Sequence, residues 1–187
     1  MKQLFYYSFL SLGFFIAACN SSDNSNSKDH EALMKSITDM EDSIMSLQRN
    51  PAQANKIPTL TNIELINRLI AFYHAYPKED YAATCLMKVH IKYSDLNAHE
   101  KALAYGDTLL TSFPKFKNRD FIIESMASTY DIMITPRDTA KIRKYYNLLL
   151  KEPTITKEKR IDVLARLKHL DMTLFEYIDF QSAPLSK

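Results

Sequence analysis

Apolar residues recur at helical spacing over most of the chain, and the clearest stripe lies between residues 30 and 49. Its members follow one another at intervals of 4, 3, 4 and 3 residues, which places them on one face of a helix. The stripe is too short for an isolated coiled coil, so two interpretations stay open: the helix docks on its own domain, or it pairs with a second copy of this chain. The stripe consists of Leu33, Ile37, Met40, Ile44 and Leu47.

After a polar, proline-containing linker at 50–59, the apolar pattern predicts a helical domain over 60–180 and a short tail at 181–187. Thr61 and Glu64 have the spacing of a capping box at the start of its first helix. Prolines fall between the later helical stretches, and no segment alternates for long enough to form a strand. The sequence therefore predicts an all-α fold, with helices over 62–75, 80–93, 98–112, 119–133, 138–151, 157–170 and 173–180.

Composition and charge exclude several classes of function. The 24 Lys and Arg residues nearly balance the 22 Asp and Glu residues, so the net charge of +2 gives no basis for nucleic-acid binding. The chain has only two glycines, and the phosphate-binding loops and nucleophile turns that need glycine are missing. Its five histidines lack any zinc-type spacing. We therefore expect no enzyme activity, no catalytic or metal-binding residues and no cofactor.

The N-terminal region has the pattern of a secretory signal peptide. Lys2 gives a positive start, and the apolar stretch that follows is shorter than the ~20 residues a spanning helix needs. The residues Ile-Ala-Ala-Cys at 16–19 resemble the bacterial lipobox. This resemblance implies that residues 1–18 are removed and that Cys19 carries the diacylglycerol and the further acyl chain, such as palmitate, of a lipoprotein. The alternative is an ordinary signal peptide with an incidental cysteine.

The residues after Cys19 are almost entirely polar. Ser, Asn and Asp make up most of 19–29, which predicts a flexible tether between the lipid and the folded domain. Asn20 stands where an aspartate would be typical of inner-membrane retention, so the pattern resembles lipoproteins of the outer membrane, with the domain facing the periplasm. Cys85 is the one other cysteine, so no disulfide is expected within the mature chain, and we expect the thiol to be buried on a helix.

An internal repeat runs through the helical domain. Pro77 and Pro114 are 37 residues apart, and Pro114 and Pro153 are 39 apart, a period typical of stacked helical hairpins. The pattern within each unit resembles the tetratricopeptide repeat (TPR), with departures at His90 and Gly106, where a small and an aromatic residue respectively are usual. The residues that carry the resemblance are Leu86, Val89, His90, Tyr93, Ala102, Leu109 and Pro114, then Ile123, Met126, Ala127, Tyr130, Ala140, Leu148 and Pro153.

Together with the lipobox, the repeat resembles small TPR lipoproteins of the bacterial envelope, a group that includes BamD-like barrel-assembly subunits and YbgF-like periplasmic proteins. The resemblance implies a short α-solenoid that acts as a non-enzymatic adaptor and binds another envelope protein in a groove. The alternatives are a BamD-like role in outer-membrane barrel assembly and a self-associating structural protein. The groove residues that the repeat register implies are Met87, Ile91, Ser94, Glu124, Ser128 and Asp131.

A basic amphipathic stretch ends the domain. Its apolar positions Ile161, Leu164 and Leu167 lie among five cations. We interpret the cations as the solvated face of a capping helix, because terminal repeats need a polar outer surface. Attraction to anionic lipid or to an acidic partner is the alternative. The cations are Lys157, Lys159, Arg160, Arg166 and Lys168.

Overall fold

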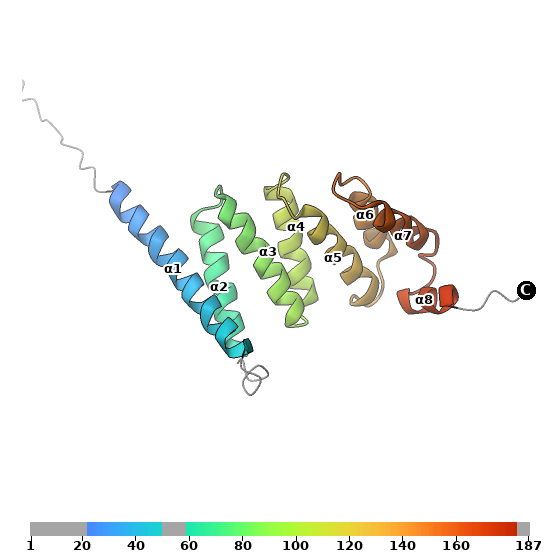
Figure 1. Cartoon of the computed structure of the whole chain (residues 1–187), viewed down its shortest axis with the longest axis horizontal. Coiled ribbons are helices and arrows are strands. Elements are labelled where there is room, and N and C mark those ends of the chain that lie inside the picture. The colour runs from blue at the N-terminus through green and yellow to red at the C-terminus, as the bar shows by residue number, and fades with distance from the viewer. Residues whose placement is uncertain (1–21, 50–58, 183–187) are drawn as a thin grey trace, which may run out of the picture.

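The computed structural model describes residues 22–49 and 59–182, which consist of helices and the turns that join them (Figure 1). The prediction of an all-α fold is confirmed for these residues, which contain no strand. The predicted helices beyond residue 59 begin and end within three residues of the observed ones. The helices are α1 (Ser22–Arg49), α2 (Thr59–Ala75), α3 (Asp80–Asp95), α4 (His99–Ser112), α5 (Arg119–Ile132), α6 (Thr139–Leu149), α7 (Lys157–Lys168) and α8 (Leu174–Ser182).

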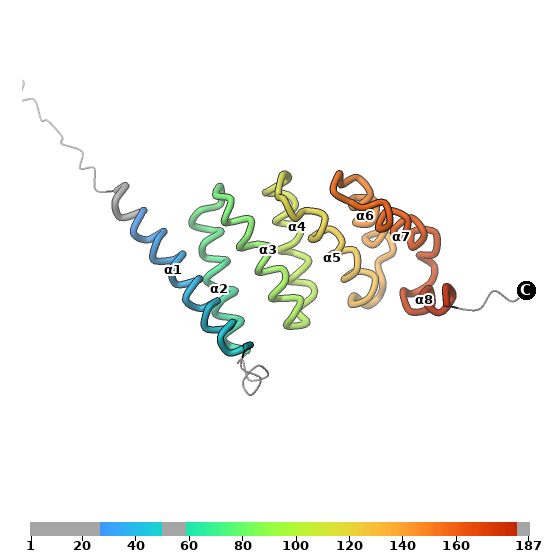
Figure 2. The backbone as a smooth tube through the Cα atoms, in the orientation of Figure 1, coloured from blue at the N-terminus to red at the C-terminus, as the bar shows by residue number. Residues whose placement is uncertain are grey.

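The helices pack against one another in chain order. Contacts join α1 to α2, α2 to α3, and so on as far as α7. Because consecutive helices run up and down beside each other, they form an elongated row with α1 at one end and α8 at the other (Figures 1 and 2). Each hairpin inside the row therefore packs against the preceding helices with one face and against the following helices with the other.

Local sequence signals explain where the helices end. Pro77, Pro114 and Pro153 each lie in a turn just after a helix, since proline lacks the N–H that a continuing helix would need. Side chains cap three of the later N-termini. At α6, Asp138 accepts from the backbone N–H of Lys141; Thr156 does the same for Lys159 at α7, and Thr173 for Glu176 at α8. These prolines and caps therefore determine where the helices begin and end.

The first helix is longer than the sequence indicated. Helix α1 begins at Ser22, whereas a helix was expected from residue 30 and a tether over 19–29. Serine, asparagine and aspartate, which dominate this segment of the sequence, are residue types that occur in the first turns of helices as well as in tethers. A polar composition is therefore compatible with helix in this segment.

The apolar stripe on α1 is used within the chain. Ile37 and Ile44 are buried in a core cluster with residues of α2 and α3, while Leu33 and Met40 pack against its edge. Leu47 is only partly buried. The structure thus has α1 docked on its own domain, and pairing of this stripe with a second copy would require α1 to leave that position.

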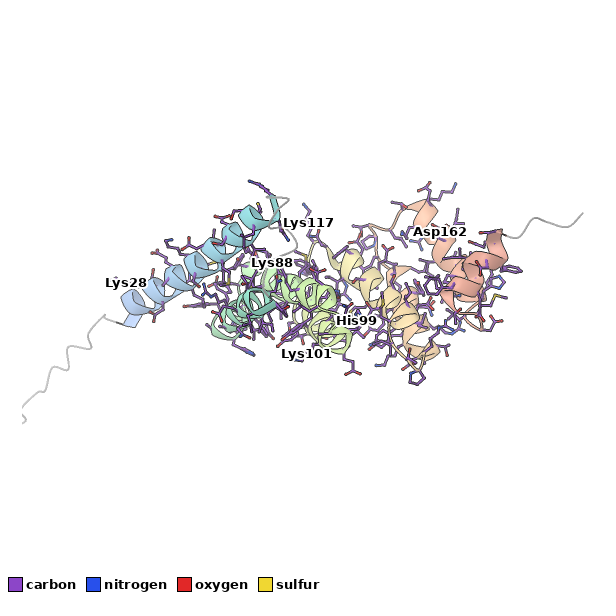
Figure 3. The ribbon with its side chains drawn as sticks, turned by 90° about the horizontal axis from the view of Figure 1, so that it is seen from below. Lys28, Lys88, His99, Lys101, Lys117 and Asp162 are labelled. Carbon is purple, nitrogen blue, oxygen red and sulfur yellow. The ribbon has the colours of Figure 1, made fainter. Side chains whose placement is uncertain are left out.

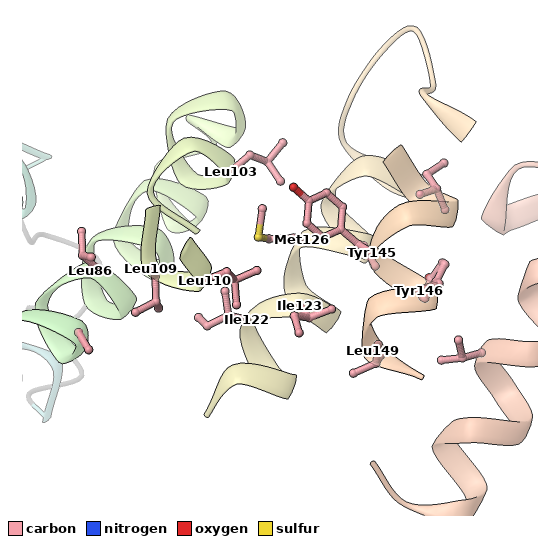
Figure 4. Packing of buried hydrophobic residues seen from close by; sticks show 14 of the residues in the cluster. Leu86, Leu103, Leu109, Leu110, Ile122, Ile123, Met126, Tyr145, Tyr146 and Leu149 are labelled. Carbon is pink, nitrogen blue, oxygen red and sulfur yellow. The ribbon is translucent and has the colours of Figure 1, made fainter. Parts of the chain in front are cut away.

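Two apolar clusters form the core. The first joins α1, α2 and α3 around Leu65, Leu69 and Phe72, and it includes Cys85, which is fully buried as expected. The second extends from α3 to α7, and Figure 4 shows Met126 and Tyr145 near its centre. A row of successive clusters is how stacked helices share their apolar faces.

Polar contacts between alternate helices recur at a constant interval. His90 of α3 contacts Ser125 of α5, and Glu124 and Asp131 of α5 pair with Lys159 and Arg166 of α7; each pair is 35 residues apart. The same sequence offset thus relates α3 to α5 and α5 to α7.

Not every position of the repeat pattern has the expected environment. Ala102 is fully buried between helices, but Ala140 is exposed in the first turn of α6. Ala140, one of the residues that carry the resemblance to the TPR, therefore does not lie at a close contact between two helices. The α5–α6 connection is six residues long, against three for the α3–α4 connection, so α6 enters its hairpin in a different register.

Candidate functional site

The main candidate site is a pocket of about 370 Å³ between α1 and α3, with one residue of α2 at its base. We call it the α1/α3 pocket. Helix α1 contributes four side chains and α3 three, so the pocket exists because α1 docks on the domain. Its lining residues are Glu41, Ile44, Met45, Gln48, Leu65, Lys88, Ile91 and Lys92.

The pocket combines an apolar interior with a charged rim. Lys88, labelled in Figure 3, donates to both carboxylate oxygens of Glu41 at 2.6 and 2.8 Å, which ties α3 to α1. This ion pair neutralises Lys88. The ammonium group of Lys92, one turn further along α3, has no ion-pair or hydrogen-bond partner among the described residues. The rim therefore carries one uncompensated positive charge beside apolar side chains, a combination suited to an apolar group that is followed by an acid.

The groove residues expected on α3 have three different environments. Ile91 lines the α1/α3 pocket. Met87 is partly buried, and its sulfur lies 3.9 Å from the amide nitrogen of Asn118. The hydroxyl oxygen of Ser94 is buried without a hydrogen-bond partner in the described part of the chain. Of the three residues, only Ile91 faces an open cavity large enough for a side chain of another protein.

The groove residues expected on α5 make contacts within the chain. Glu124 accepts from the Lys159 ammonium at 2.6 Å, and both side chains stay about 40% exposed. Ser128 hydrogen-bonds the hydroxyl of Tyr146, and burial raises the pKa of that tyrosine to about 12. The first contact joins α5 to α7 and the second joins α5 to α6, and a pocket of about 130 Å³ lies beside Glu124.

The expectation that Asp131 faces a groove is wrong. Its side chain is fully buried, with both oxygens held by Arg166 at 2.8 Å and one by Arg137 at 2.7 Å. Arg166 also donates to the backbone carbonyls of His169 and Met172. A carboxylate at this depth needs such partners, because burying an unpaired charge is costly. Asp131 therefore holds α7 and the segment before α8 onto α5.

The same contacts correct the interpretation of α7. Arg166 is not part of a solvated cationic face, since it is 4% exposed and paired with Asp131. Ile161 and Leu164 are instead exposed, at 58% and 47%. The outer surface of α7 is therefore mixed rather than purely polar.

Nothing in the sequence pattern pointed to Glu41, Met45, Lys88 or Lys92 as site residues. The first two lie on α1, and their proximity to α3 depends on a docking that the sequence left undecided. The sequence held one indication of this site. Lys88 and Lys92 flank the predicted groove residue Ile91, and residues about one turn apart share a helix face.

Two buried ionisable side chains, Cys85 and His90, contribute to packing inside the domain. Burial raises the pKa of the Cys85 thiol to about 12, which keeps it protonated and unreactive at neutral pH. Burial lowers the pKa of His90, whose Nδ1 donates to the carbonyl of Ala102 and whose Nε2 accepts from Ser125. Within residues 22–49 and 59–182, no three His, Cys, Asp or Glu side chains are grouped so that they could hold a metal ion.

The described part of the chain is thus all-helical, with an amphiphilic recess between α1 and α3. Comparison of the chain with protein-family models, with curated proteins and with solved structures finds no match. In the described part of the chain, no helix has the length and apolarity needed to cross a bilayer. Cys19, the predicted signal peptide at 1–18, most of the predicted 50–59 linker and the end of the predicted tail lie outside the described residues.

Proposed function

We propose that this protein is a non-enzymatic adaptor of the bacterial envelope, held at the outer membrane by acylated Cys19 and facing the periplasm. Its TPR-like row of helices binds another envelope protein, and the α1/α3 pocket receives an apolar side chain of that partner. The lipid confines the search for the partner to one membrane surface.

Three features support this proposal. The helices pack in chain order as hairpins, which is how repeat adaptors display an extended binding surface. The 35-residue offset between alternate helices is close to the 34-residue period of the TPR. The lipobox-like residues at 16–19 directly follow an apolar stretch of signal-peptide length.

The observation that carries the binding role is the α1/α3 pocket itself. It is open, its interior is apolar, and it contains Ile91, which the repeat pattern places on the first-helix face of its unit. Apolar anchors that fill such pockets supply much of the energy of peptide recognition, and rim charges set orientation.

Site-specific crosslinking in living cells tests the binding role. A photoreactive residue at Met45 or at Lys92 places the probe at the pocket, while the same residue at the exposed Ala104 of α4 serves as the control. We expect one discrete crosslinked protein from the two pocket positions and none from Ala104. Absence of any crosslink at the pocket, or the same products at all three positions, would refute the assignment.

Intact mass spectrometry of the membrane-extracted protein tests the anchor. The wild type should lack residues 1–18 and carry acyl mass, and the Cys19→Ala variant should carry none. An unacylated wild-type mass would remove the lipid anchor from the proposal and leave the adaptor role to the crosslinking result.

A further inference from the structure

Exposed apolar side chains gather at the end of the row that α7 and α8 form (Figure 1). Ile161 and Leu164 of α7 are 58% and 47% exposed, and Phe175 and Ile178 of α8 are 68% and 48% exposed. Inside the row, the apolar faces of the helices are covered by the helices that follow. We call these four residues the end patch.

The α7 part of the end patch faces away from the domain. Arg166 of α7 pairs with a buried carboxylate of α5, and Ile161 and Leu164 lie on the opposite side of the helix, since successive residues are about 100° apart around its axis. Lys157 and Lys168 share this outward side, four residues before Ile161 and four after Leu164. Both ammonium groups lack an ion-pair or hydrogen-bond partner among the described residues.

Two acids of α7 lie beside this outward side. Glu158 and Asp162 each follow one of its residues by one position, so each lies about 100° around the helix from that residue. Two of the five cations of α7 are paired with carboxylates of α5, which leaves three cations against these two acids. The helix therefore has a small net positive charge, and a lysine lies at each end of its exposed apolar pair.

The α8 part of the end patch carries the opposite charge. Buried Tyr177 is where α8 packs on the domain, with the guanidinium of Arg166 5.2 Å from the centre of its ring. Phe175 and Asp179 are each two positions from Tyr177, so both lie on the outward side of α8. The helix contains no lysine or arginine, and its other acid, Glu176, accepts a hydrogen bond from the backbone at the helix start. The carboxylate of Asp179 has no partner in the described part of the chain.

We propose that the end patch is a contact between two copies of this chain, with α7 of each copy packed on α8 of the other. The outward sides of the two helices complement each other, since apolar residues meet apolar residues and lysines meet an aspartate. Both sides point away from the domain, so they meet only between two chains. A two-fold axis brings both pairs of helices together at once, as in other self-complementary interfaces. This pairing does not depend on the lipid anchor of the proposed function.

The area of the end patch fits an interface between two copies. Four side chains of this size and exposure leave about 400 Å² of apolar surface on each copy. A standard interface covers about 800 Å² on each partner, and a little over half of that area is apolar. The α1/α3 pocket lies towards the other end of the row, so pairing through α7 and α8 leaves it open in both copies (Figure 1).

Sedimentation equilibrium of the chain from residue 22 onward tests the pairing, because all the described helices and both core clusters lie in this part of the chain. We expect the mass to reach that of two copies by about 100 µM, since interfaces of this size bind with a micromolar or tighter Kd. Leu164→Glu with Phe175→Glu should weaken pairing at least about 100-fold, because unpaired charges would be buried in an apolar contact. A wild type that stays a single copy, or pairing that survives both substitutions, would overturn the inference.

Phe121→Glu with Met133→Glu is the matched control. These two side chains are similarly exposed, at 49% and 52%, but they lie on α5 and directly after it. Pairing should be unchanged in this variant, and circular dichroism should show the same helix content in the wild type and both variants. Loss of pairing in the control would mean that any exposed apolar side chain supports association, which would refute the end patch as the contact.

Charge exchange tests which helices meet. Lys157→Glu with Lys168→Glu places acids opposite Asp179 of the second copy and should weaken pairing at least about tenfold, because like charges repel across an interface. Adding Asp179→Lys to that variant should return the affinity to within about threefold of the wild type. All these side chains are exposed, so the substitutions should leave the fold intact. A triple variant that pairs no better than the double variant would refute the packing of α7 on α8 of the second copy.

Discussion

Gly106 leaves the space that the ring of His90 occupies. A Cβ atom at Gly106 would lie 3.2 Å from Nδ1 of His90 and 2.7 Å from the sulfur of Met126. His90 is itself fully buried, and its ring bridges Ala102 of α4 and Ser125 of α5. His90 and Gly106, the two departures from the TPR-like pattern, therefore compensate for each other. The large side chain on α3 fits because the facing residue of α4 has no side chain.

Gly106→Ala should destabilise the protein, although alanine favours helix by about 1 kcal/mol over glycine. The new methyl group would press on two buried side chains, and overpacking of this kind costs typically 1–3 kcal/mol, so we expect a net loss of about 1 kcal/mol. Urea unfolding of the two proteins measures it. The control is Ala104→Gly on the same helix, where the exposed alanine is preferred; a more stable Gly106→Ala would contradict the packing argument.

The stability of the protein should fall as the pH drops below about 6.5. Burial lowers the pKa of His90 in the folded state, so the unfolded chain binds a proton first and is favoured in acid. If the folded state does not protonate, the loss reaches about 2 kcal/mol at about pH 5. His90→Gln can keep the bonds to Ala102 and Ser125 without titrating, and its unfolding free energy should vary less over this range. Identical pH profiles would assign the acid sensitivity to other groups.

Removing one partner of the buried Asp131–Arg166 pair should cost far more than removing one partner of an exposed pair. Asp131→Asn leaves two arginines without their counter-charge, and such changes cost about 3–5 kcal/mol. Glu124→Gln breaks the half-exposed pair with Lys159 and should cost less than about 1 kcal/mol. Denaturant midpoints compare the two variants, and hydrogen exchange should place the lost protection in α7 and α8. Equal costs would mean that Asp131 is solvated.

The helix positions were predictable because apolar spacing, prolines and caps act within a few residues of one another. The beginning of α1 was not, since serine, asparagine and aspartate occur both in tethers and in helix first turns. The environment of Asp131 also escaped prediction. Its partners Arg137 and Arg166 come from two other segments, one of them 35 residues away, and the sequence offered no reason to pair them.

The candidate site was only half predictable for a related reason. Ile91 followed from its place on α3, a property of one helix. The other wall of the pocket, with Glu41 and Met45, depends on α1 docking, a tertiary event whose energy comes from many weak apolar contacts.

Truncation of the α1 stripe should destabilise folding and not dissociate an oligomer. Ile37 and Ile44 are buried against α2 and α3, so Ile37→Ala or Ile44→Ala should lower the free energy of unfolding by about 1–4 kcal/mol. The control is Met45→Ala, on the exposed side of the same helix, which should change stability by less than about 0.5 kcal/mol. Sedimentation over a hundredfold concentration range should then give the same masses for Ile37→Ala as for the wild type, because the stripe is already occupied. If instead Ile37→Ala left unfolding unaltered and lowered a concentration-dependent mass, the stripe would belong to an interface between copies, and α1 would have to leave the position that forms the α1/α3 pocket.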